Sequence, residues 1–449
     1  MAESNPAAHG ERQPRLLYVA WGYPPSRGAG MYRALATTNA FARAGWDVTV
    51  LTATQDTFEG ITGTDPEAEK SIDPRVRVVR IPFDPERTQA DLSRWSRLRV
   101  YSPLLWTALG WVKSMRIFPE RGYGHWRPAL VDAADRIHRE SPLDLVIGSA
   151  NPNVDFTPGD HLHSSYGVPY VMDYRDAWHL DVYTGRQIGG RFTPSTRMER
   201  RLLANATEAW FVNAPIRDWH RREYPERADD FHVVANGFDP DFLTTGRERM
   251  PDPDSGLTFG YLGTIYGPIP LRETLEGWRL ARRESQLMAR SRLVFRGRLG
   301  HYAEPDAHAA ALLDEFRGDA VTYEGPVSKT QVAEVYSRFD ALVLIISHSR
   351  YVTSGKVFEY AATGLPIAAL HHPETAATSV LEGRPLWFPI ERISPEAIAA
   401  ALIRTGNAAA TLTADGLHDA RVWSQHLARE EQLAPRITAL RSHIDEITS

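Results

Sequence analysis

The feature that most constrains the fold is a regular alternation of short apolar segments with longer segments of helical periodicity. Each apolar segment is rich in Val, Ile, Leu and aromatic residues and is followed by a loop and a helical stretch. In the first half the apolar segments lie at 15–21, 47–53, 76–81, 144–149, 168–173 and 208–213. In the second half they lie at 257–263, 292–297, 320–323, 341–346 and 366–370. This alternation predicts an α/β fold with parallel sheets that helices cover on both faces.

A run rich in Pro, Asp, Gly and Arg separates the two halves near residues 236–256 and is the best candidate for a domain boundary. We therefore predict two doubly wound, Rossmann-like domains that face a cleft, at 15–240 and 257–430, after a disordered tail at 1–14. Residues 431–449 predict a C-terminal helix that packs back on the first domain. Its buried face is expected to carry Ile437, Leu440, Ile444 and Ile447.

Composition excludes several classes of protein. The 51 basic and 56 acidic residues give a net charge of −5, which disfavours a nucleic-acid-binding protein. The absence of cysteine excludes disulfides, thiolate catalysis and iron–sulfur clusters, and it fits a reducing cytoplasm. The longest apolar runs, such as residues 341–346, are much shorter than the roughly 20 residues that a helix needs to cross a bilayer. We expect a soluble cytoplasmic protein without a signal peptide.

The most informative segment for function is residues 353–366, TSGKVFEYAATGLP. Thr353 or Ser354 suits a helix N-cap, and Gly364 and Pro366 suit the helix end. Free N–H groups at Ser354 and Gly355 would bind an anion. Lys356, one of only four lysines in the chain, would add a compact positive charge, and the same helix carries a carboxylate one turn further on, Glu359. This pattern fits a nucleoside diphosphate, although a capped helix with a solvated Lys–Glu pair has the same spacing.

This segment resembles the donor-binding segment of retaining GT-B glycosyltransferases of family 4. Further stretches resemble that family in the expected order: WGYPPSRGAGMYRALATTNAFARAGWDVTVLT, YRDAW, ANGFD, YLGTIYG and VTYEGPVSKTQVAEVYSRFDALVL. The resemblance spans residues 15–445 and implies a GT-B fold with an acceptor-side first domain and a nucleotide-sugar-binding second domain. It implies that Glu359 binds the ribose of a UDP- or GDP-linked sugar while Lys356 and the helix N-terminus hold the diphosphate. The remaining donor-binding residues are predicted to be Ser354, Gly355, Val327, Thr264 and Arg296.

Two positions depart from the family pattern. Tyr351 stands where the family often has a second Glu, eight residues before the ribose-binding one. The loop GTIYGPIP carries Thr264 and no cation where the family often has an Arg and a Lys. Phosphate charge would then rest on Lys356, with Arg296 or Arg298. An altered donor and a loss of activity both remain open.

The first domain offers a second set of candidate residues in loops that follow strands. Gly28 and Gly30 would let backbone approach a ligand, and the resemblance places their loop at the reaction centre. A dinucleotide fingerprint fails because Arg33 occupies the place of its third glycine. The family often has a His and an Asp in the later YRDAW loop, where this chain has Arg175 and Asp176. We predict Lys356, Asp176 and Arg175 as catalytic, with Asp176 orienting the acceptor or accepting its proton; an Asp–Arg pair that stiffens the loop is the alternative.

No metal site is expected, because the two Asp-Pro-Asp sequences at 239–241 and 252–254 lie in the linker and contain proline. Five basic residues flank apolar and aromatic ones between Arg94 and Arg116. These could form a surface for a membrane or a lipid acceptor. We expect instead that the aromatics belong to the core or line an acceptor pocket, so peripheral membrane contact is not favoured.

The sequence thus predicts a biosynthetic, metal-independent glycosyltransferase that uses a nucleoside-diphosphate sugar as substrate, retains configuration and needs no cofactor. The acceptor is expected to be a small molecule, glycan or lipid. Two alternatives remain: a catalytically silent nucleotide-sugar-binding partner, and a nucleotide-sugar epimerase on the same fold.

Overall fold

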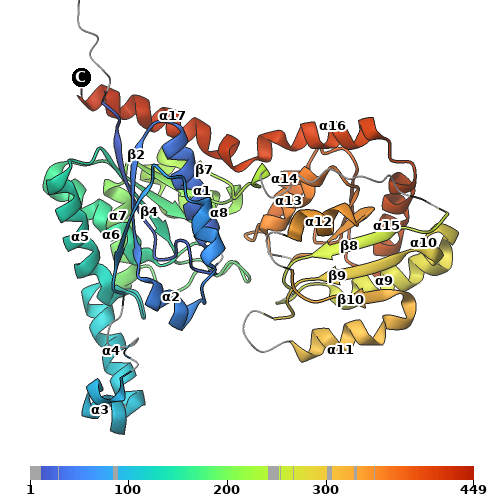
Figure 1. The fold of residues 1–449 in the computed structure, drawn as a ribbon, viewed down its shortest axis with the longest axis horizontal. Helices are drawn as coiled ribbons and strands as arrows, with labels where there is room; N and C mark the ends of the chain where they lie inside the picture. Colours follow the sequence, from blue (N-terminus) through green and yellow to red (C-terminus); the bar gives the residue numbers. More distant parts are fainter. Residues whose placement is uncertain are drawn as a thin grey trace, which may run out of the picture.

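The computed structural model describes residues 12–28, 30–83, 89, 91–240, 252, 254–265, 267–300, 306–327, 331–347 and 349–448. The chain forms two domains, each built on one parallel sheet. The last two helices, Ala414–Ser424 and Arg429–Thr448, lie on the second and on the first domain, respectively (Figure 1). Asp241 and Pro253, which belong to the two Asp-Pro-Asp sequences of the linker, lie outside the described residues.

The first domain contains a seven-stranded sheet of order β3-β2-β1-β4-β5-β6-β7. Its strands are β1 (Arg15–Val19), β2 (Asp47–Ala53), β3 (Arg77–Ile81), β4 (Leu145–Ala150), β5 (Tyr170–Tyr174), β6 (Glu208–Phe211) and β7 (Phe231–Val233). Its helices are α1 (Gly30–Arg43), α2 (Gln55–Ile61), α3 (Arg97–Tyr101), α4 (Pro103–Ile117), α5 (Arg127–Glu140), α6 (Thr157–Tyr166), α7 (Pro194–Asn205) and α8 (Ala214–Glu223).

The second domain contains a six-stranded sheet of order β10-β9-β8-β11-β12-β13. Its strands are β8 (Thr258–Leu262), β9 (Arg292–Arg296), β10 (Val321–Tyr323), β11 (Ala341–Leu344), β12 (Ile367–Ala369) and β13 (Trp387–Pro389). Its helices are α9 (Leu271–Glu284), α10 (Gln286–Arg290), α11 (Ala307–Glu315), α12 (Val332–Ser337), α13 (Gly355–Thr363), α14 (Ala376–Leu381), α15 (Pro395–Ala410) and α16 (Ala414–Ser424), and α17 (Arg429–Thr448) ends the chain.

Successive side chains of each strand point to opposite faces of the sheet, so each strand contributes to two cores, one under the helices of each face. In β1, Leu17 and Val19 pack with α5 to α8, while Leu16 and Tyr18 pack with α1 and α17. The second sheet packs against α9, α11 and α15 on one face and against α12, α13, α14 and α16 on the other. The predicted α/β class with two doubly wound parallel sheets is therefore confirmed.

The C-terminal helix packs on the first domain as predicted, with Leu433, Ile437, Leu440 and Ile444 buried against the core that contains α1. Ile447 is an exception: it is 61% exposed, so its predicted burial is wrong.

The predicted burial of the aromatic and apolar residues between Arg94 and Arg116 is also wrong. Helix α4 buries only Ser114, and α3 buries no residue. Both helices project from the first domain instead of joining its core (Figure 1). No described helix is both long enough and apolar enough to cross a lipid bilayer.

Candidate functional site

Each sheet has one point at which the strand order reverses, and the candidate residues gather at both points. The order reverses between β1 and β4 in the first sheet and between β8 and β11 in the second. Loops leave adjacent strands in opposite directions there, so a crevice forms at the carboxyl ends of the strands. The two crevices are the places where each sheet can hold a ligand.

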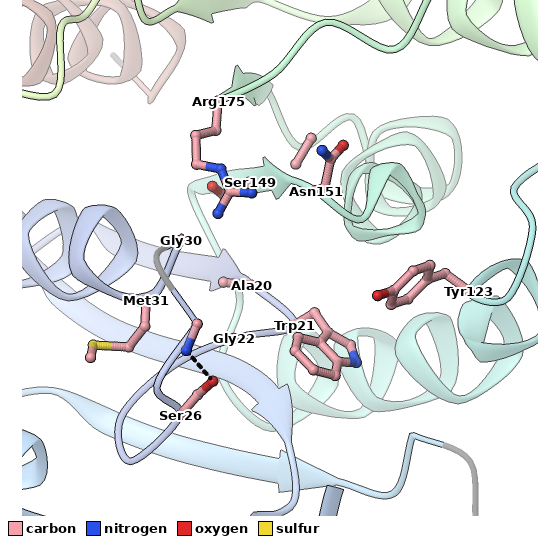
Figure 2. A pocket seen from close by; sticks show the side chains of 12 residues that line it. Ala20, Trp21, Gly22, Ser26, Gly30, Met31, Tyr123, Ser149, Asn151 and Arg175 are labelled. Atoms are coloured by element: carbon pink, nitrogen blue, oxygen red, sulfur yellow. Dashed lines mark hydrogen bonds between the residues drawn. The ribbon is translucent and has the colours of Figure 1, made fainter. Parts of the chain in front are cut away.

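The crevice of the first domain is a pocket of about 210 Å³. Its lining comes from the segment after β1, the first turn of α1, the end of β4 and the residue after β5: Ala20, Trp21, Gly22, Ser26, Gly28, Gly30, Met31, Tyr123, Ser149, Ala150, Asn151 and Arg175. Figure 2 shows Arg175, Ser149 and Asn151 on one side of the pocket and the Gly22–Gly30 loop on the other. The predicted residues Gly28, Gly30 and Arg175 therefore lie together.

Gly30 has a steric reason to be glycine. A Cβ atom at this position would lie 2.0 Å from Nη1 of Arg175, so any side chain would displace the guanidinium. Gly28 is held nearby, because its N–H donates to Ser26 Oγ at 3.2 Å. The glycine loop and Arg175 thus fix each other's positions at the start of α1.

Asp176 lies beside the pocket and is connected to it by two of the lining residues. Its Oδ2 accepts hydrogen bonds from Nε and Nη2 of Arg175, both at 3.2 Å, and from Nδ2 of Asn151 at 3.3 Å. The Asp–Arg pair, which was the alternative to a catalytic role for Asp176, is therefore present. Since the Asp176 side chain is 45% exposed, it is also within reach of a ligand.

The N-terminus of α13 and the loop after β8 lie at the point where the strand order of the second sheet reverses. Ser354 is the N-cap, and its Oγ accepts from the N–H of Lys356 at 3.4 Å. Gly364 ends the helix in the left-handed region at φ 80°. These are the caps predicted from the sequence, and they leave the first N–H groups of α13 directed at the crevice.

Lys356 lies over the ring of Tyr261, with Nζ 4.3 Å from the ring centroid. The ammonium donates to Tyr261 Oη and, at 3.4 Å, to the carbonyl oxygen of Thr264. Gly263 permits this approach, since a Cβ there would lie 2.6 Å from Lys356 Cδ. Burial lowers the pKa of Lys356 from 10.5 to about 7, and the carboxylate of Glu359 opposes that shift. The ammonium is therefore poorly stabilised until an anion joins it.

Glu359 lies one turn further along α13. Its Oε2 accepts the hydroxyl proton of Tyr336 at 3.0 Å, which orients the carboxylate. Burial raises the pKa of Tyr32 in α1, and Asp65 and Glu359 add to the rise. Glu359 of α13 and Tyr32 of α1 therefore interact electrostatically across the domain boundary.

The other residues predicted to bind the donor make contacts within the second domain. Arg296 forms an ion pair with Glu324 at 2.8 Å, so its charge is already partly compensated. Thr264 offers its backbone carbonyl to Lys356. Val327 packs against the core under α13. Among the described residues no group of three His, Asp or Glu side chains could hold a metal ion.

Sequence reasoning missed the contacts that join the domains next to this site. Asn213 Nδ2 donates to the carbonyl oxygen of Tyr351 at 2.9 Å and to Thr353 Oγ1 at 3.1 Å. The Tyr351 ring also contacts Gly185, and Ser349 Oγ donates to the carbonyl oxygen of Val182. It also missed Tyr261 and Tyr336, which lie in two of the stretches that resemble the family, YLGTIYG and VTYEGPVSKTQVAEVYSRFDALVL.

Comparisons with known proteins agree with this architecture. Residues 28–237 match the family model described as a glycosyl transferase 4-like domain. A 93-residue stretch is 32% identical to α-maltose-1-phosphate synthase of Mycolicibacterium smegmatis, covering 20% of this chain and only 23% of that enzyme.

Two solved structures resemble nearly the whole chain. Sucrose-phosphate synthase from Thermosynechococcus elongatus is 16% identical with a TM-score of 0.60, covering 96% of this chain and 100% of that one. The Anabaena protein HepE in complex with UDP is 13% identical with a TM-score of 0.58, covering 97% and 99%. The chain thus has the GT-B fold, and its residues 28–237 are similar to the glycosyl transferase 4-like domain.

Proposed function

We propose that the protein transfers a glycosyl group from a nucleoside-diphosphate sugar to an acceptor with retention of configuration and without a metal ion. The observation that carries this proposal is the position of Lys356. Its ammonium is buried at the N-terminus of α13, and burial lowers its pKa to about 7 although the carboxylate of Glu359 opposes the shift. A diphosphate bound there would add negative charge that favours the ammonium form.

The donor site would use three features of α13. The N–H groups after Ser354 and the Lys356 ammonium bind the diphosphate, since a helix N-terminus and a cation both favour negative charge. Glu359, oriented by Tyr336, accepts hydrogen bonds from the ribose hydroxyls. UDP is our first choice of nucleotide, because HepE was solved with UDP, and GDP is the second.

The reaction would take place between the two crevices. The acceptor occupies the pocket lined by Gly28, Gly30 and Arg175. The bond between the anomeric carbon and the diphosphate oxygen breaks as the acceptor oxygen bonds to that carbon, and Asp176 orients the acceptor or takes its proton. Lys356 and the helix N-terminus stabilise the charge that develops on the leaving diphosphate.

Nucleotide binding tests the donor half of this proposal. Isothermal titration with UDP, GDP, ADP and TDP, each with and without chelator, is expected to find one preferred base whose affinity does not depend on the chelator. Glu359→Gln is expected to weaken that affinity about 10- to 100-fold by removing charge-assisted hydrogen bonds to the ribose. The control is Glu276→Gln, which changes a half-exposed Glu on α9 and should leave affinity unchanged. Equal affinity in all three proteins would refute the site.

A second candidate, a nucleotide-sugar-binding protein without turnover, is favoured by one observation. Tyr351 replaces a glutamate often found in the family, and its carbonyl and ring are engaged by the first domain. NMR of the bound nucleotide sugar with a panel of acceptors separates the candidates. Transfer supports the transferase, an intact donor supports the silent partner, and conversion of the sugar without an acceptor supports the epimerase.

A further inference from the structure

The strongest feature that the proposed function leaves unused is the helical projection at residues 92–117, hereafter the α3–α4 surface. It comprises the turn at Leu92–Arg94 together with α3 and α4, and it extends away from the first domain (Figure 1). The 15 residues of α4 bury one side chain, Ser114. Helices of globular proteins owe most of their stability to burial of an apolar face, so the exposure of this one requires an explanation.

The exposed side chains are mainly large and apolar. Leu104 is 87% exposed and Tyr101 is 82% exposed. The others are Leu92, Leu98, Val100, Leu105, Leu109, Trp111, Val112 and Met115. A contiguous apolar surface of this kind usually marks a contact with another molecule or with a membrane.

The exposed large apolar residues of α4 share one side of the helix. At about 100° per residue, Trp111, Leu104, Met115, Val112, Leu105 and Leu109 fall within about half of the circumference, and Ser114 falls outside it. Ser114 holds the base of the helix, because its Oγ donates to the carbonyl oxygen of Glu120 at 3.0 Å and accepts from the N–H of His125 at 3.2 Å. The apolar side therefore faces away from the domain.

The charge of the α3–α4 surface has one sign. Residues 92–117 contain Arg94, Arg97, Arg99, Lys113 and Arg116 but no Asp or Glu, in a chain whose net charge is −5. Arg99 lies over the rings of Trp95 and Trp106, 3.8 and 4.9 Å from their centroids. Tryptophan, leucine and basic residues on one exposed helix match the boundary between headgroups and acyl chains of an anionic bilayer.

We infer that the α3–α4 surface binds an anionic lipid bilayer, with the apolar side of α4 inserted among the headgroups and the basic residues contacting lipid phosphates. A second copy of the chain fits less well, because it would bring two clusters of five cations together. At 15 residues α4 is too short to span, so the contact is peripheral. This inference does not depend on the proposed glycosyl transfer.

Co-sedimentation with lipid vesicles tests the inference. Wild-type protein is expected to bind vesicles in which about a third of the lipid is phosphatidylglycerol and to bind pure phosphatidylcholine much more weakly. The double variant Leu104→Glu/Leu105→Glu is expected to lose binding to both. Lys113→Gln/Arg116→Gln is expected to weaken binding to the anionic vesicles about 25-fold, from about fivefold for each cation removed.

Matched controls change exposed residues elsewhere. Ile447→Glu on α17 matches the apolar change, and Arg317→Gln/Arg338→Gln in the second domain matches the charge change. Both should bind vesicles like wild type. The inference is overturned by absent binding, by binding that ignores lipid charge, or by binding that Leu104→Glu/Leu105→Glu retains. It is also overturned if wild type is a dimer in light scattering that this variant dissolves, since a second copy then covers the surface.

Discussion

Lys356 is the single residue whose environment makes the most specific prediction. In the empty protein, burial lowers its pKa to about 7, and a bound diphosphate would favour the charged form and raise that pKa again. Above pH 7 nucleotide binding must then take up a proton, and affinity should fall roughly tenfold per pH unit between pH 7 and 9. Titration calorimetry at pH 8 in two buffers with different ionisation enthalpies measures the uptake.

Lys356→Met removes the titrating group and provides the control. The variant should bind more weakly at pH 7 but show no proton uptake, and its affinity should change little from pH 7 to 9. The sign for folding also follows: between pH 7 and 10.5 the unfolded chain binds more protons at this residue, so its contribution to stability rises with pH. Equal binding heats of wild type in the two buffers would show that Lys356 keeps its charge in the empty site.

At the scale of the element, α13 is held at its C-terminal end by two arginines. Arg384 is buried and donates to the carbonyl oxygens of Ala361 and Leu365, and Arg421 donates to that of Thr363. These bonds satisfy carbonyls that the end of a helix leaves unpaired, and cations at this end complement the helix dipole. Because α13 carries both Lys356 and Glu359, its anchoring also fixes the candidate donor site.

Arg384→Met is therefore expected to destabilise the protein by about 2–4 kcal/mol, since it removes the hydrogen bonds from a buried guanidinium to the carbonyl oxygens of Ala361 and Leu365. Arg404→Met is the matched change, because Arg404 makes one exposed hydrogen bond to Pro389, and it should cost less than about 0.5 kcal/mol. Urea unfolding followed by tryptophan fluorescence compares the two. Identical midpoints would mean that α13 is held by packing alone.

At the scale of the whole molecule, sequence reasoning succeeded where burial is local and failed where it depends on distant partners. Interior strands such as β1 and β11 were predictable because they are continuous apolar runs. The three-residue edge strands β7 and β13 were missed, whereas the equally short edge strand β10 was predicted within residues 320–323. The apolar residues of α4 were expected to be buried, since composition does not reveal whether a helix has a partner.

The candidate site also has features that the sequence predicts and features that it does not. The caps of α13 and the position of Lys356 followed from spacing within one segment. The stacking of Lys356 on Tyr261, 95 positions earlier, and the contact of Gly30 with Arg175 depend on how strands order themselves in the sheets. Such pairs are fixed by topology, which no short motif encodes.

Asn213 joins the two domains, and its two side-chain atoms allow their roles to be separated. Its Oδ1 accepts from the N–H of Ile216 at 2.9 Å and caps α8, while Nδ2 donates to Tyr351 and Thr353 of the second domain. Asn213→Ser retains a good N-cap but lacks the Nδ2 group that donates to the second domain. We expect it to unfold at nearly the wild-type urea concentration while amide hydrogen exchange at residues 349–353 becomes roughly fivefold faster.

Asn213→Ala loses both contacts and should show the same faster exchange together with a loss of about 1 kcal/mol from the missing cap. The contrast matters because residues 349–353 lead directly into the N-terminus of α13, where the diphosphate is proposed to bind. If the domain contact positions this loop, both variants should also bind nucleotide more weakly than wild type, to the same extent. Unchanged exchange at 349–353 in Asn213→Ser would show that Ser349 and the Tyr351 ring hold the domains together without Asn213.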